Sequence, residues 1–239
     1  MYSSFLMLPP KDYEGILAAK KKLTNAVSLF TIQVQDTAFS FVAGQFMMLS
    51  ITPERGLARA FSICSSPEKK NQVEFCMKIN QNSVVSEKIE QAGLKTKVYL
   101  KGPFGAFTLK PATKELVFIA GGTGIAPIRS MISTLIHQKI KENIWLFYRF
   151  KTPEECLFKE ELESFARQYK NFKLILSVSN PTPEWRQETE RVQSIITKYI
   201  KDPSKVECYI CGPPPMVKDL VEELPDLGFV PENIHREAW

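Results

Sequence analysis

The chain has 239 residues, which is enough for one large domain or two small ones. Its composition, 44% hydrophobic and 24% charged, is ordinary for a globular protein, and no apolar run approaches the roughly 20 residues needed to span a bilayer. The net charge of +5 is too small and too dispersed to indicate nucleic-acid binding. Residues 1–10 have no basic start and no long apolar stretch, so we expect a cytoplasmic protein without a membrane segment.

The cysteines and histidines do not predict a disulfide framework or a metal site. There are five cysteines, an odd number. Cys208 and Cys211 form a C-x-x-C, but they lie in a strand-like segment, where residues three apart face opposite sides of a sheet. The other cysteines are too scattered to hold an iron–sulfur cluster. The two histidines, His137 and His235, have no partners at metal-ligand spacing.

Residues 1–110 contain a series of short β segments. We predict strands at 27–34, 46–51, 73–79 and 96–100, with one helix at 84–91. Several of the strands alternate apolar and polar residues, and turn residues such as Ala43-Gly44 separate them. Many short strands with few helices are typical of a small antiparallel β-barrel.

After Pro111 the pattern changes to strands that alternate with helices. We predict strands at 116–120, 144–148, 172–178 and 206–210, and helices at 128–136, 158–169, 192–200 and 216–224. Short apolar runs are typical of strands buried on both faces, and the alternation predicts a doubly wound parallel sheet. We therefore expect two domains, an antiparallel β-barrel over 1–110 and an α/β domain over 111–239.

Two loops of the second half have features of nucleotide-binding turns. The segment 121–127 follows the first strand and contains three glycines, which let a backbone approach a pyrophosphate closely. Pro127 stands where a helix would begin, and the free N–H groups of a helix start favour an anion. The segment 211–216 repeats the arrangement after the fourth strand. Either could be a plain turn, but two such loops at one sheet edge predict two walls of one site.

A third motif, Arg59-Ala60-Phe61-Ser62, falls at a strand of the first half. Alternation places Arg59 and Phe61 on one face, where a guanidinium can bind phosphate and a ring can stack on a flat cofactor. On these residues alone, an exposed arginine beside a core phenylalanine is the simpler interpretation. Strict alternation also turns Ser62 away from that face unless the strand bends.

Taken together, the motifs resemble those of the ferredoxin–NADP reductase family, in which a flavin-binding barrel is joined to a nicotinamide-nucleotide domain. The matching segments, in family order, are 59–62, 102–105, 121–127, 211–216 and 237–239. The resemblance implies an NAD(P)H-dependent flavin oxidoreductase with FAD as cofactor, FMN being the less frequent choice. Such an enzyme takes hydride from NADPH or NADH and passes electrons on one at a time.

The resemblance also implies roles for residues of the barrel. Arg59 would hold the flavin pyrophosphate, Phe61 would lie beside the isoalloxazine in place of the usual tyrosine, and Ser62 would hydrogen-bond near flavin N5. Residues 77–79 would run along the ribityl chain, and 83–86 would form a phosphate-binding turn, although the family often has glycine in place of Ser83. The other residues assigned to the flavin are Ala60, Met77, Lys78, Ile79, Val84, Val85 and Ser86.

In the second half, the resemblance places Thr123 near the nicotinamide and Cys211 beside its C4 atom. Trp239 would cover the flavin at rest and move aside for the nucleotide, and Glu237 would relay protons. Ser62, Cys211, Glu237 and Trp239 are thus the candidate catalytic residues, while the cofactors supply the hydride chemistry and the protein supplies position. The other residues assigned to the nucleotide are Gly122, Gly124, Pro127, Arg149, Lys151, Gly212, Pro213 and Met216.

The sequence leaves the nucleotide and the electron acceptor open. Arg149 and Lys151 follow the second strand, with no Asp before Glu154, which favours NADPH slightly over NADH. The acceptor could be a ferredoxin, a flavodoxin or an oxygenase component, and the positive net charge favours an acidic protein. The alternatives are a reductase of free flavin or ferric complexes and a non-catalytic nucleotide-binding electron-transfer subunit. Oligomeric state and direction of electron flow also stay open.

Overall fold

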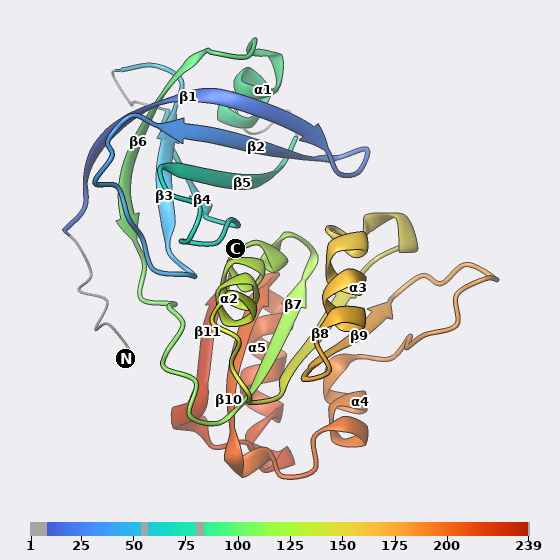
Figure 1. Ribbon diagram of the computed structural model, residues 1–239. Coiled ribbons are helices and arrows are strands. Elements are labelled where there is room, and N and C mark those ends of the chain that lie inside the picture. Colours follow the sequence, from blue (N-terminus) through green and yellow to red (C-terminus); the bar gives the residue numbers. More distant parts are fainter. Residues whose placement is uncertain (1–8, 54–56, 80–83, 239) are drawn as a thin grey trace. The chain divides into compact units, whose positions relative to one another are not determined.

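The computed structural model describes residues 9–53, 57–79 and 84–238 (Figure 1). The chain forms two compact units, and each is described by itself below. The first comprises the residues up to Lys110 together with Arg129–His137, and the second comprises Pro111–Ile128 and the residues from Gln138 onward. The predicted domain limits, 1–110 and 111–239, stay a prediction. Within the described ranges, no helix is long and apolar enough to cross a membrane.

Six antiparallel strands form the sheet of the first unit, in the order β4-β3-β6-β1-β2-β5. Their bounds are β1 Lys11–Lys22, β2 Val27–Val34, β3 Phe46–Ser50, β4 Arg59–Ser62, β5 Gln72–Lys78 and β6 Lys97–Phe104. The sheet nearly closes on itself, because Ile63, just after β4, forms an antiparallel bridge with Phe75 of β5. The backbone N–H of Cys64 also donates to the carbonyl of Glu74 at 2.9 Å. The predicted antiparallel β-barrel is therefore confirmed.

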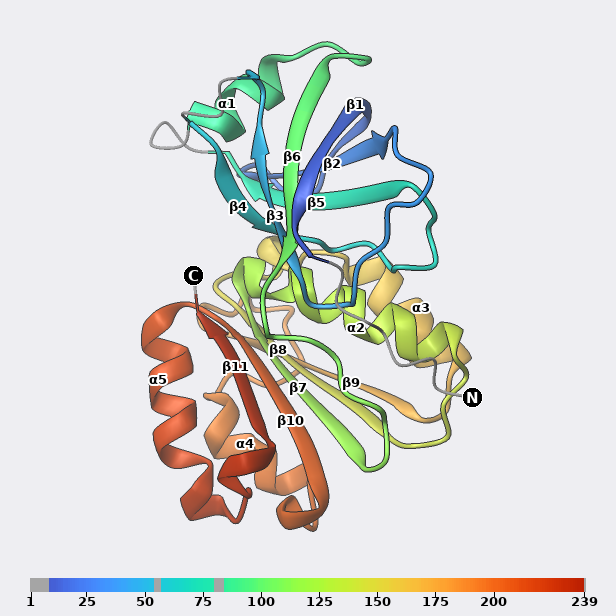
Figure 2. The same ribbon diagram turned by 90° about the vertical axis from the view of Figure 1, so that its left-hand side faces the viewer.

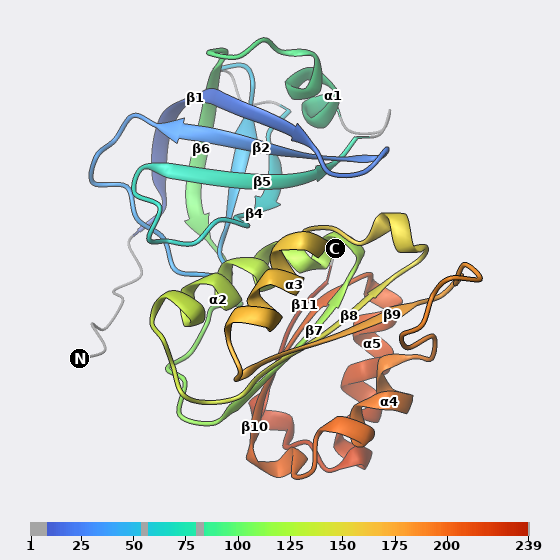
Figure 3. The ribbon, with the colours of Figure 1, turned by 45° about the vertical axis from the view of Figure 1, so that its right-hand side comes forward.

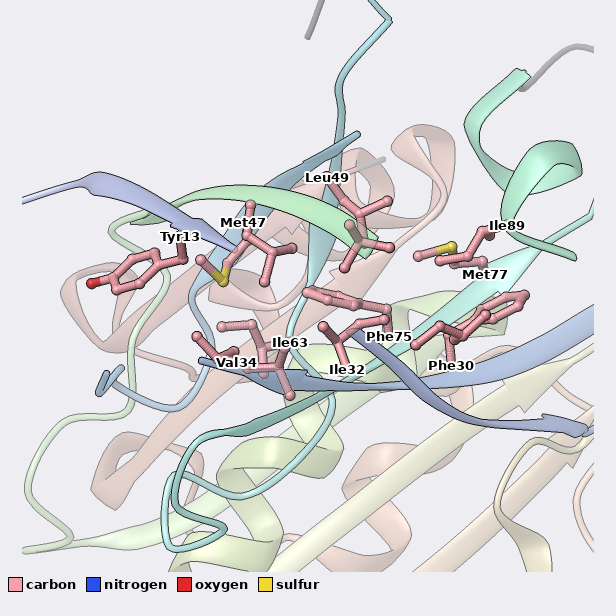
Figure 4. Close-up of a cluster of buried hydrophobic side chains, with 14 of the residues drawn as sticks. Tyr13, Phe30, Ile32, Val34, Met47, Leu49, Ile63, Phe75, Met77 and Ile89 are labelled. Atoms are coloured by element: carbon pink, nitrogen blue, oxygen red, sulfur yellow. The ribbon is translucent and has the colours of Figure 1, made fainter. Parts of the chain in front are cut away.

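The inward-facing side chains of these strands fill the barrel (Figure 4). Phe75 lies in the middle of the cluster, near Ile32 and Ile63, and all three side chains are fully buried. Helix α1 (Val84–Gln91) adds Val85 and Ile89 to the cluster. Burial of each large apolar side chain contributes about 1.5–3 kcal/mol, so this core fixes the strands that carry the candidate flavin residues.

The second unit is built on a sheet of five parallel strands in the order β11-β10-β7-β8-β9. Their bounds are β7 Glu115–Gly121, β8 Ile144–Phe150, β9 Phe172–Val178, β10 Val206–Gly212 and β11 Ile234–Ala238. Helix α3 (Lys159–Gln168) lies on one face, and α4 (Val192–Tyr199) and α5 (Pro214–Glu223) lie on the other (Figures 2 and 3). The predicted doubly wound α/β sheet is therefore confirmed.

The remaining elements are short connections and one longer helix. Helix α2 (Ile125–His137) follows β7. The 3-10 turns are η1 Gly122–Gly124, η2 Pro153–Glu155, η3 Pro203–Lys205, η4 Pro225–Leu227 and η5 Pro231–Asn233.

The core between the sheet and helices α4 and α5 explains the two cysteines of β10. Cys208 packs in this core between Val206 and Ile210, the residues two positions away on either side, whereas Cys211 is outside the cluster. Alternation along the strand thus separates the two sulfurs, as the sequence predicts. All five cysteines lie in the described part of the chain; they are buried, and none is in a disulfide.

Two strands were not among those predicted. β1 is twelve residues long and has an irregular register between Leu17 and Ala19, so its apolar residues do not alternate regularly. β11 is a short edge strand whose residues are all partly or fully exposed, so it lacks the apolar pattern of a buried strand. In the structure, β1 is defined by its hydrogen bonds to β2 and β6, and β11 by its hydrogen bonds to β10.

Candidate functional site

Strand β4 carries the candidate flavin residues from the first motif. Ser62 is 8% exposed, and its Oγ has no hydrogen-bond partner in the described part of the chain. Buried polar atoms in proteins are nearly always hydrogen-bonded, so this hydroxyl is available to a ligand. Arg59 is exposed, and its Nη1 donates to the carbonyl of Ala58 at 3.1 Å. Phe61 is half-buried, with its ring centroid 6.4 Å from that of Phe75. These residues are compatible with the predicted flavin site, and their individual roles stay a prediction.

The other predicted flavin segments could act mainly through their backbone. The Met77 side chain lies in the barrel core, so only its main chain is available to a cofactor. Val85 and Ser86, in the first turn of α1, are buried as well. The first N–H groups of a helix have no intrahelical acceptor, so the start of α1 can donate to a phosphate. Lys78 and Val84 are exposed. Ser83 lies outside the described residues.

In the second unit, strand register gathers several candidate residues at the carboxyl edge of the sheet. Cys211 of β10 is level with Ala120 of β7 and with Glu237 of β11. One residue further along, Gly121 is level with Arg149 of β8. Because ligands of open parallel sheets bind beyond this edge, the register favours a single nucleotide site.

Two glycines of the first loop serve different purposes. A side chain on Gly124 would meet the carbonyl oxygen of Cys211 at 2.3 Å, so this glycine lets the two loops pack together. Gly122 has a φ of +53°, and nothing lies within 4 Å of where its side chain would be. Its backbone therefore faces open space, and the Tyr148 hydroxyl donates to its carbonyl at 3.1 Å. This bare, fixed backbone fits the close approach of a pyrophosphate.

The position of Pro127 differs from the prediction. Helix α2 begins at Ile125, directly after η1, so Pro127 is its third residue rather than its first. Proline is still accommodated, because the N–H groups of the first helical turn have no intrahelical acceptor. Pro127 and Gly124 are buried, and Thr123 is half-buried.

A pocket of about 480 Å³ lies beside these loops, entirely within the second unit. Of the predicted residues, it is lined by Gly122, Arg149, Lys151, Pro213 and Met216. The predicted residues Thr123, Gly124, Pro127, Cys211 and Gly212 do not line it. The pocket also includes Arg191, Gln193 and Asp219, which the sequence did not predict.

Glu237 has the properties of a group that holds a proton near neutral pH. Its Oε2 is buried without a hydrogen-bond partner in the described part of the chain, and burial raises the pKa of Glu237 to about 7. A carboxyl group with a pKa near the working pH can both donate and accept a proton. Its role as a relay stays a prediction. Trp239 lies outside the described residues.

Comparison with known proteins identifies the family. The model of the oxidoreductase FAD-binding domain matches residues 14–109, and that of the oxidoreductase NAD-binding domain matches residues 118–222. The chain belongs to the ferredoxin–NADP reductase-like flavoprotein family. The predicted resemblance, the oxidoreductase class and the binding of FAD and a nicotinamide nucleotide are thereby confirmed.

Curated relatives of this flavoprotein include electron transfer components of dioxygenases and a subunit of NADH-quinone reductases. The anthranilate 1,2-dioxygenase electron transfer component of Acinetobacter baylyi is 26% identical over 200 residues, which are 83% of this chain and 58% of the relative. A subunit of the Na(+)-translocating NADH-quinone reductase of a Marinomonas species is 34% identical over 194 residues, 74% of this chain and 47% of the relative. The flavoprotein thus spans about half of the length of these relatives.

Solved structures share the fold over nearly the whole chain. A ferredoxin NADP+ reductase from Neisseria gonorrhoeae, solved with bound FAD and NADP, matches with a TM-score of 0.83 and 23% identity. The match covers 95% of this chain and 98% of that one. The ferredoxin reductase in carbazole 1,9a-dioxygenase matches with a TM-score of 0.84 and 22% identity, over 97% of this chain and 70% of that one.

Proposed function

We propose that this flavoprotein takes hydride from NADPH or NADH onto FAD and passes the electrons to a separate acceptor protein. One observation carries the proposal: each unit presents a prepared site of its own. The barrel offers the buried, unpartnered hydroxyl of Ser62, and the sheet offers the bare backbone of Gly122 beside a pocket.

In the barrel, Arg59 and the start of α1 would bind the phosphates of FAD, because both present donors that favour anions. Phe61 would contact the isoalloxazine, and the Ser62 hydroxyl would hydrogen-bond to the ring. Bound FAD supplies the capacity to accept a hydride and to release electrons one at a time.

In the second unit, the loops at Gly122 and Pro213 would hold the pyrophosphate, and Tyr148 would keep the first loop in place through its hydrogen bond to Gly122. Cys211 would orient the nicotinamide from the β10 loop. Glu237 would hold a proton near neutral pH, since burial raises its pKa to about 7. Trp239, one residue past the described strand, would cover the flavin at rest.

For the acceptor we propose an acidic electron carrier or an oxygenase component. Relatives of the chain include the electron transfer components of anthranilate and toluate 1,2-dioxygenases and the phenol hydroxylase P5 protein. The net charge of +5 favours encounter with an acidic protein. A cytoplasmic location stays a prediction from the sequence.

An anaerobic absorbance spectrum of the purified protein tests the proposal. We expect a flavin spectrum that bleaches on titration with NADPH or NADH, followed by electron transfer to a carrier protein. Absence of flavin after reconstitution with FAD and with FMN would contradict the proposal and favour a non-catalytic subunit. Rapid reduction of free flavin or a ferric chelate, with no gain from any carrier, would replace the acceptor protein with a small molecule.

A further inference from the structure

A groove of about 660 Å³ lies in the second unit, at the opposite end of the sheet from the nucleotide pocket. Its walls come from the first residues of β8 and β9, the last turn of α3 with the loop that follows it, and the end of α4. Trp145 of this groove is the second residue of β8, whereas Arg149, which lines the nucleotide pocket, is near the other end of that strand. A ligand in the groove would therefore leave the nucleotide pocket free.

Two aromatic rings form the apolar wall of the groove, and hydrogen bonds hold them in place. The ring centroids of Trp145 and Tyr199 are 6.2 Å apart. Trp145 Nε1 donates to Glu115 Oε1, and Tyr199 Oη donates to Glu188 Oε1 at 2.8 Å. Both rings are half-buried, so their polar atoms are used within the protein while part of their apolar surface stays open. Tyrosine and tryptophan surface of this kind is enriched in protein interfaces.

The charged side chains that line the groove are positive. Lys170 and Lys173 are exposed and line it, and no carboxylate of the described residues does so. Neither ammonium group forms an ion pair with another described residue. The carboxylates behind the aromatic wall are already used, because Glu115 accepts the Trp145 N–H and Glu188 lies 3.3 Å from Lys198 Nζ. The groove therefore favours an acidic ligand over a basic one.

The groove runs beside backbone groups of β9 that point away from the sheet. β9 is an edge strand, with β8 as its neighbour on one side (Figure 3). The N–H of Ile144 donates to the carbonyl of Asn171 at 2.8 Å, and in a parallel pair every second residue of a strand bonds to the same neighbour. The carbonyl of Phe172 and both backbone groups of Leu174 therefore face the open side of β9, where a further strand can bond to them.

The chain covers one half of this edge and leaves the other half open. At the carboxyl end of β9, Glu188 forms a parallel bridge with Ser177, and its carbonyl accepts the N–H of Val178 at 3.1 Å. The half that lines the groove, from Phe172 to Ile175, has no such cover among the described residues. Open edges can add an extended segment of another chain, whose backbone supplies the hydrogen bonds while neighbouring side chains select its sequence.

We propose that this groove binds an extended acidic segment of a partner protein. The segment adds a strand to the open half of β9, places an apolar side chain against Trp145 and Tyr199, and pairs its carboxylates with Lys170 and Lys173. Because the groove lies at the amino ends of the strands, the bound partner does not compete with the nicotinamide nucleotide. The contact goes beyond the proposed electron transfer, since it holds a partner to the flavoprotein whichever acceptor receives the electrons.

Fluorescence anisotropy with the FAD-loaded full chain tests the proposal. The probe is a fluorescein-labelled heptapeptide with Val-Leu-Val at its centre and two glutamates on each side. One control peptide has lysines in place of the glutamates, and another is N-methylated at the three central residues. We expect both controls to bind at least about tenfold more weakly than the probe, because one reverses its charge and the other removes its backbone donors. The bound probe should also slow hydrogen exchange of residues 172–176, and saturating NADP+ should not displace it.

Variants of the protein assign the binding to the groove. Lys170→Glu combined with Lys173→Glu should weaken binding of the probe by at least about tenfold. The matched control is Lys21→Glu combined with Lys70→Glu, which changes the net charge equally at exposed lysines of the first unit. It should change the affinity by less than about twofold, because distant exposed charges are screened. Leu174→Pro removes the outward N–H, a change that edge strands tolerate, and should also weaken binding. Circular dichroism shows whether each variant is folded.

Four outcomes would overturn the proposal. No binding of the probe at about 1 mM, or equal binding of the lysine peptide, would show that the two lysines only protect the edge from strand pairing. Equal binding of the N-methylated peptide would exclude strand addition. Displacement of the probe by NADP+ would place it in the nucleotide pocket. A dimer in sedimentation velocity that Leu174→Pro dissociates would assign the edge to a second copy of the chain. In each case, bleaching of the flavin by NADPH or NADH would leave the proposed function intact.

Discussion

Ser62 and Ser65 are both buried, but they differ in their hydrogen bonding. Ser65 Oγ accepts the backbone N–H of Glu74 at 3.0 Å, whereas Ser62 Oγ has no partner in the described structure. We therefore expect Ser65→Ala to lower the free energy of unfolding by about 1 kcal/mol. Ser62→Ala is expected to leave the flavin-free protein as stable as the wild type, or about 1 kcal/mol more stable, because it removes an unsatisfied hydroxyl. Urea denaturation of the flavin-free proteins measures both effects.

The same Ser62→Ala variant tests the proposed role of the hydroxyl. If Ser62 hydrogen-bonds to the flavin ring, the rate of flavin reduction by NADPH is expected to fall by about tenfold or more, because a buried hydrogen bond is lost. Anaerobic stopped-flow absorbance measures this rate. An unchanged rate would assign Ser62 to neither binding nor catalysis.

Glu237 gives a prediction for the pH dependence of stability. Burial raises its pKa from the ordinary 4.5 to about 7, so the folded state binds its proton more tightly than the unfolded state. The free energy of unfolding is therefore expected to fall as pH rises from about 4.5 to about 7. Glu237→Gln should remove this loss. At pH 8 the free energy of unfolding of the variant should be higher than that of the wild type by on the order of 2 kcal/mol, a value that allows for solvent screening of a partly exposed group.

Urea midpoints at pH 5 and pH 8 measure this difference. Glu232→Gln is the control, since Glu232 is exposed and the substitution is the same. If the stability of Glu237→Gln depends on pH as strongly as that of the wild type, the pKa of Glu237 is not raised in the folded protein.

At the scale of single residues, the sequence predicted where the loops lie but not which residues of different loops come together. The glycines of 121–124 predicted a turn, and Gly122 indeed has a positive φ. Arg191 was not predicted, because it is separated in the chain from Arg149 and no local pattern distinguishes it from a surface arginine. Only the fold shows that both line one pocket.

Strand β5 and the second half of helix α2 are joined by a buried ion pair within the first unit. Arg129 Nη1 is 2.8 Å from Glu74 Oε2, both side chains are 9% exposed, and the same nitrogen donates to the Cys64 carbonyl at 2.7 Å. Arg129→Met would leave the carboxylate of Glu74 buried, with Lys69 as its remaining cationic partner among the described residues. We expect the free energy of unfolding to fall by about 3–5 kcal/mol.

Thermal or urea unfolding at neutral pH tests this prediction. The control is Lys97→Met, because Lys97 forms an exposed pair with Glu14 that should contribute little to stability. Adding Glu74→Gln to Arg129→Met should recover part of the loss, since the uncompensated charge is removed. A loss of similar size in the Arg129 and Lys97 variants would contradict the assignment of a buried pair.

The pair also predicts acid sensitivity. Burial alone would raise the pKa of Glu74, but the charge of Arg129 and hydrogen bonds from Lys69 and Arg129 hold it below its ordinary value. A lowered pKa means that the stabilisation is present above about pH 4.5 and is lost as pH falls further. Urea midpoints at pH 6 and pH 3.5 should therefore differ less in the double variant than in the wild type.

At the scale of elements, prediction succeeded where periodicity is local. Helix α1 and strands β2 and β9 have the predicted bounds, because each carries a continuous apolar pattern. β1 and β11 were missed for different reasons. An irregular register breaks the alternation of β1, and β11 has little apolar surface, so its pairing to β10 depends on backbone hydrogen bonds that leave no sequence pattern.

At the scale of the whole chain, the change of pattern near residue 110 predicted both architectures, because a barrel and a parallel sheet require different periodicities. The order of the strands in each sheet could not be predicted from the sequence. In the parallel sheet, β7 lies between β8 and β10, a placement set by crossover connections rather than by any residue of the strands. That order forms the site, because it places the β7 and β10 loops side by side.

The net charge of +5 gives the last prediction, on the electron acceptor. If the acceptor is an acidic protein, attraction between opposite charges speeds encounter, and salt screens that attraction over a Debye length of about 10 Å at 0.1 M. The second-order rate of electron transfer to an acidic ferredoxin should therefore fall by about tenfold or more between 20 mM and 500 mM NaCl. Transfer to riboflavin, which is uncharged, should change by less than about twofold, because there is no charge to screen. Steady-state reduction of each acceptor at saturating NADPH measures both rates. A fall of equal size for the two acceptors would place the salt effect on the flavoprotein itself, and no fall for either would contradict an electrostatically guided partner.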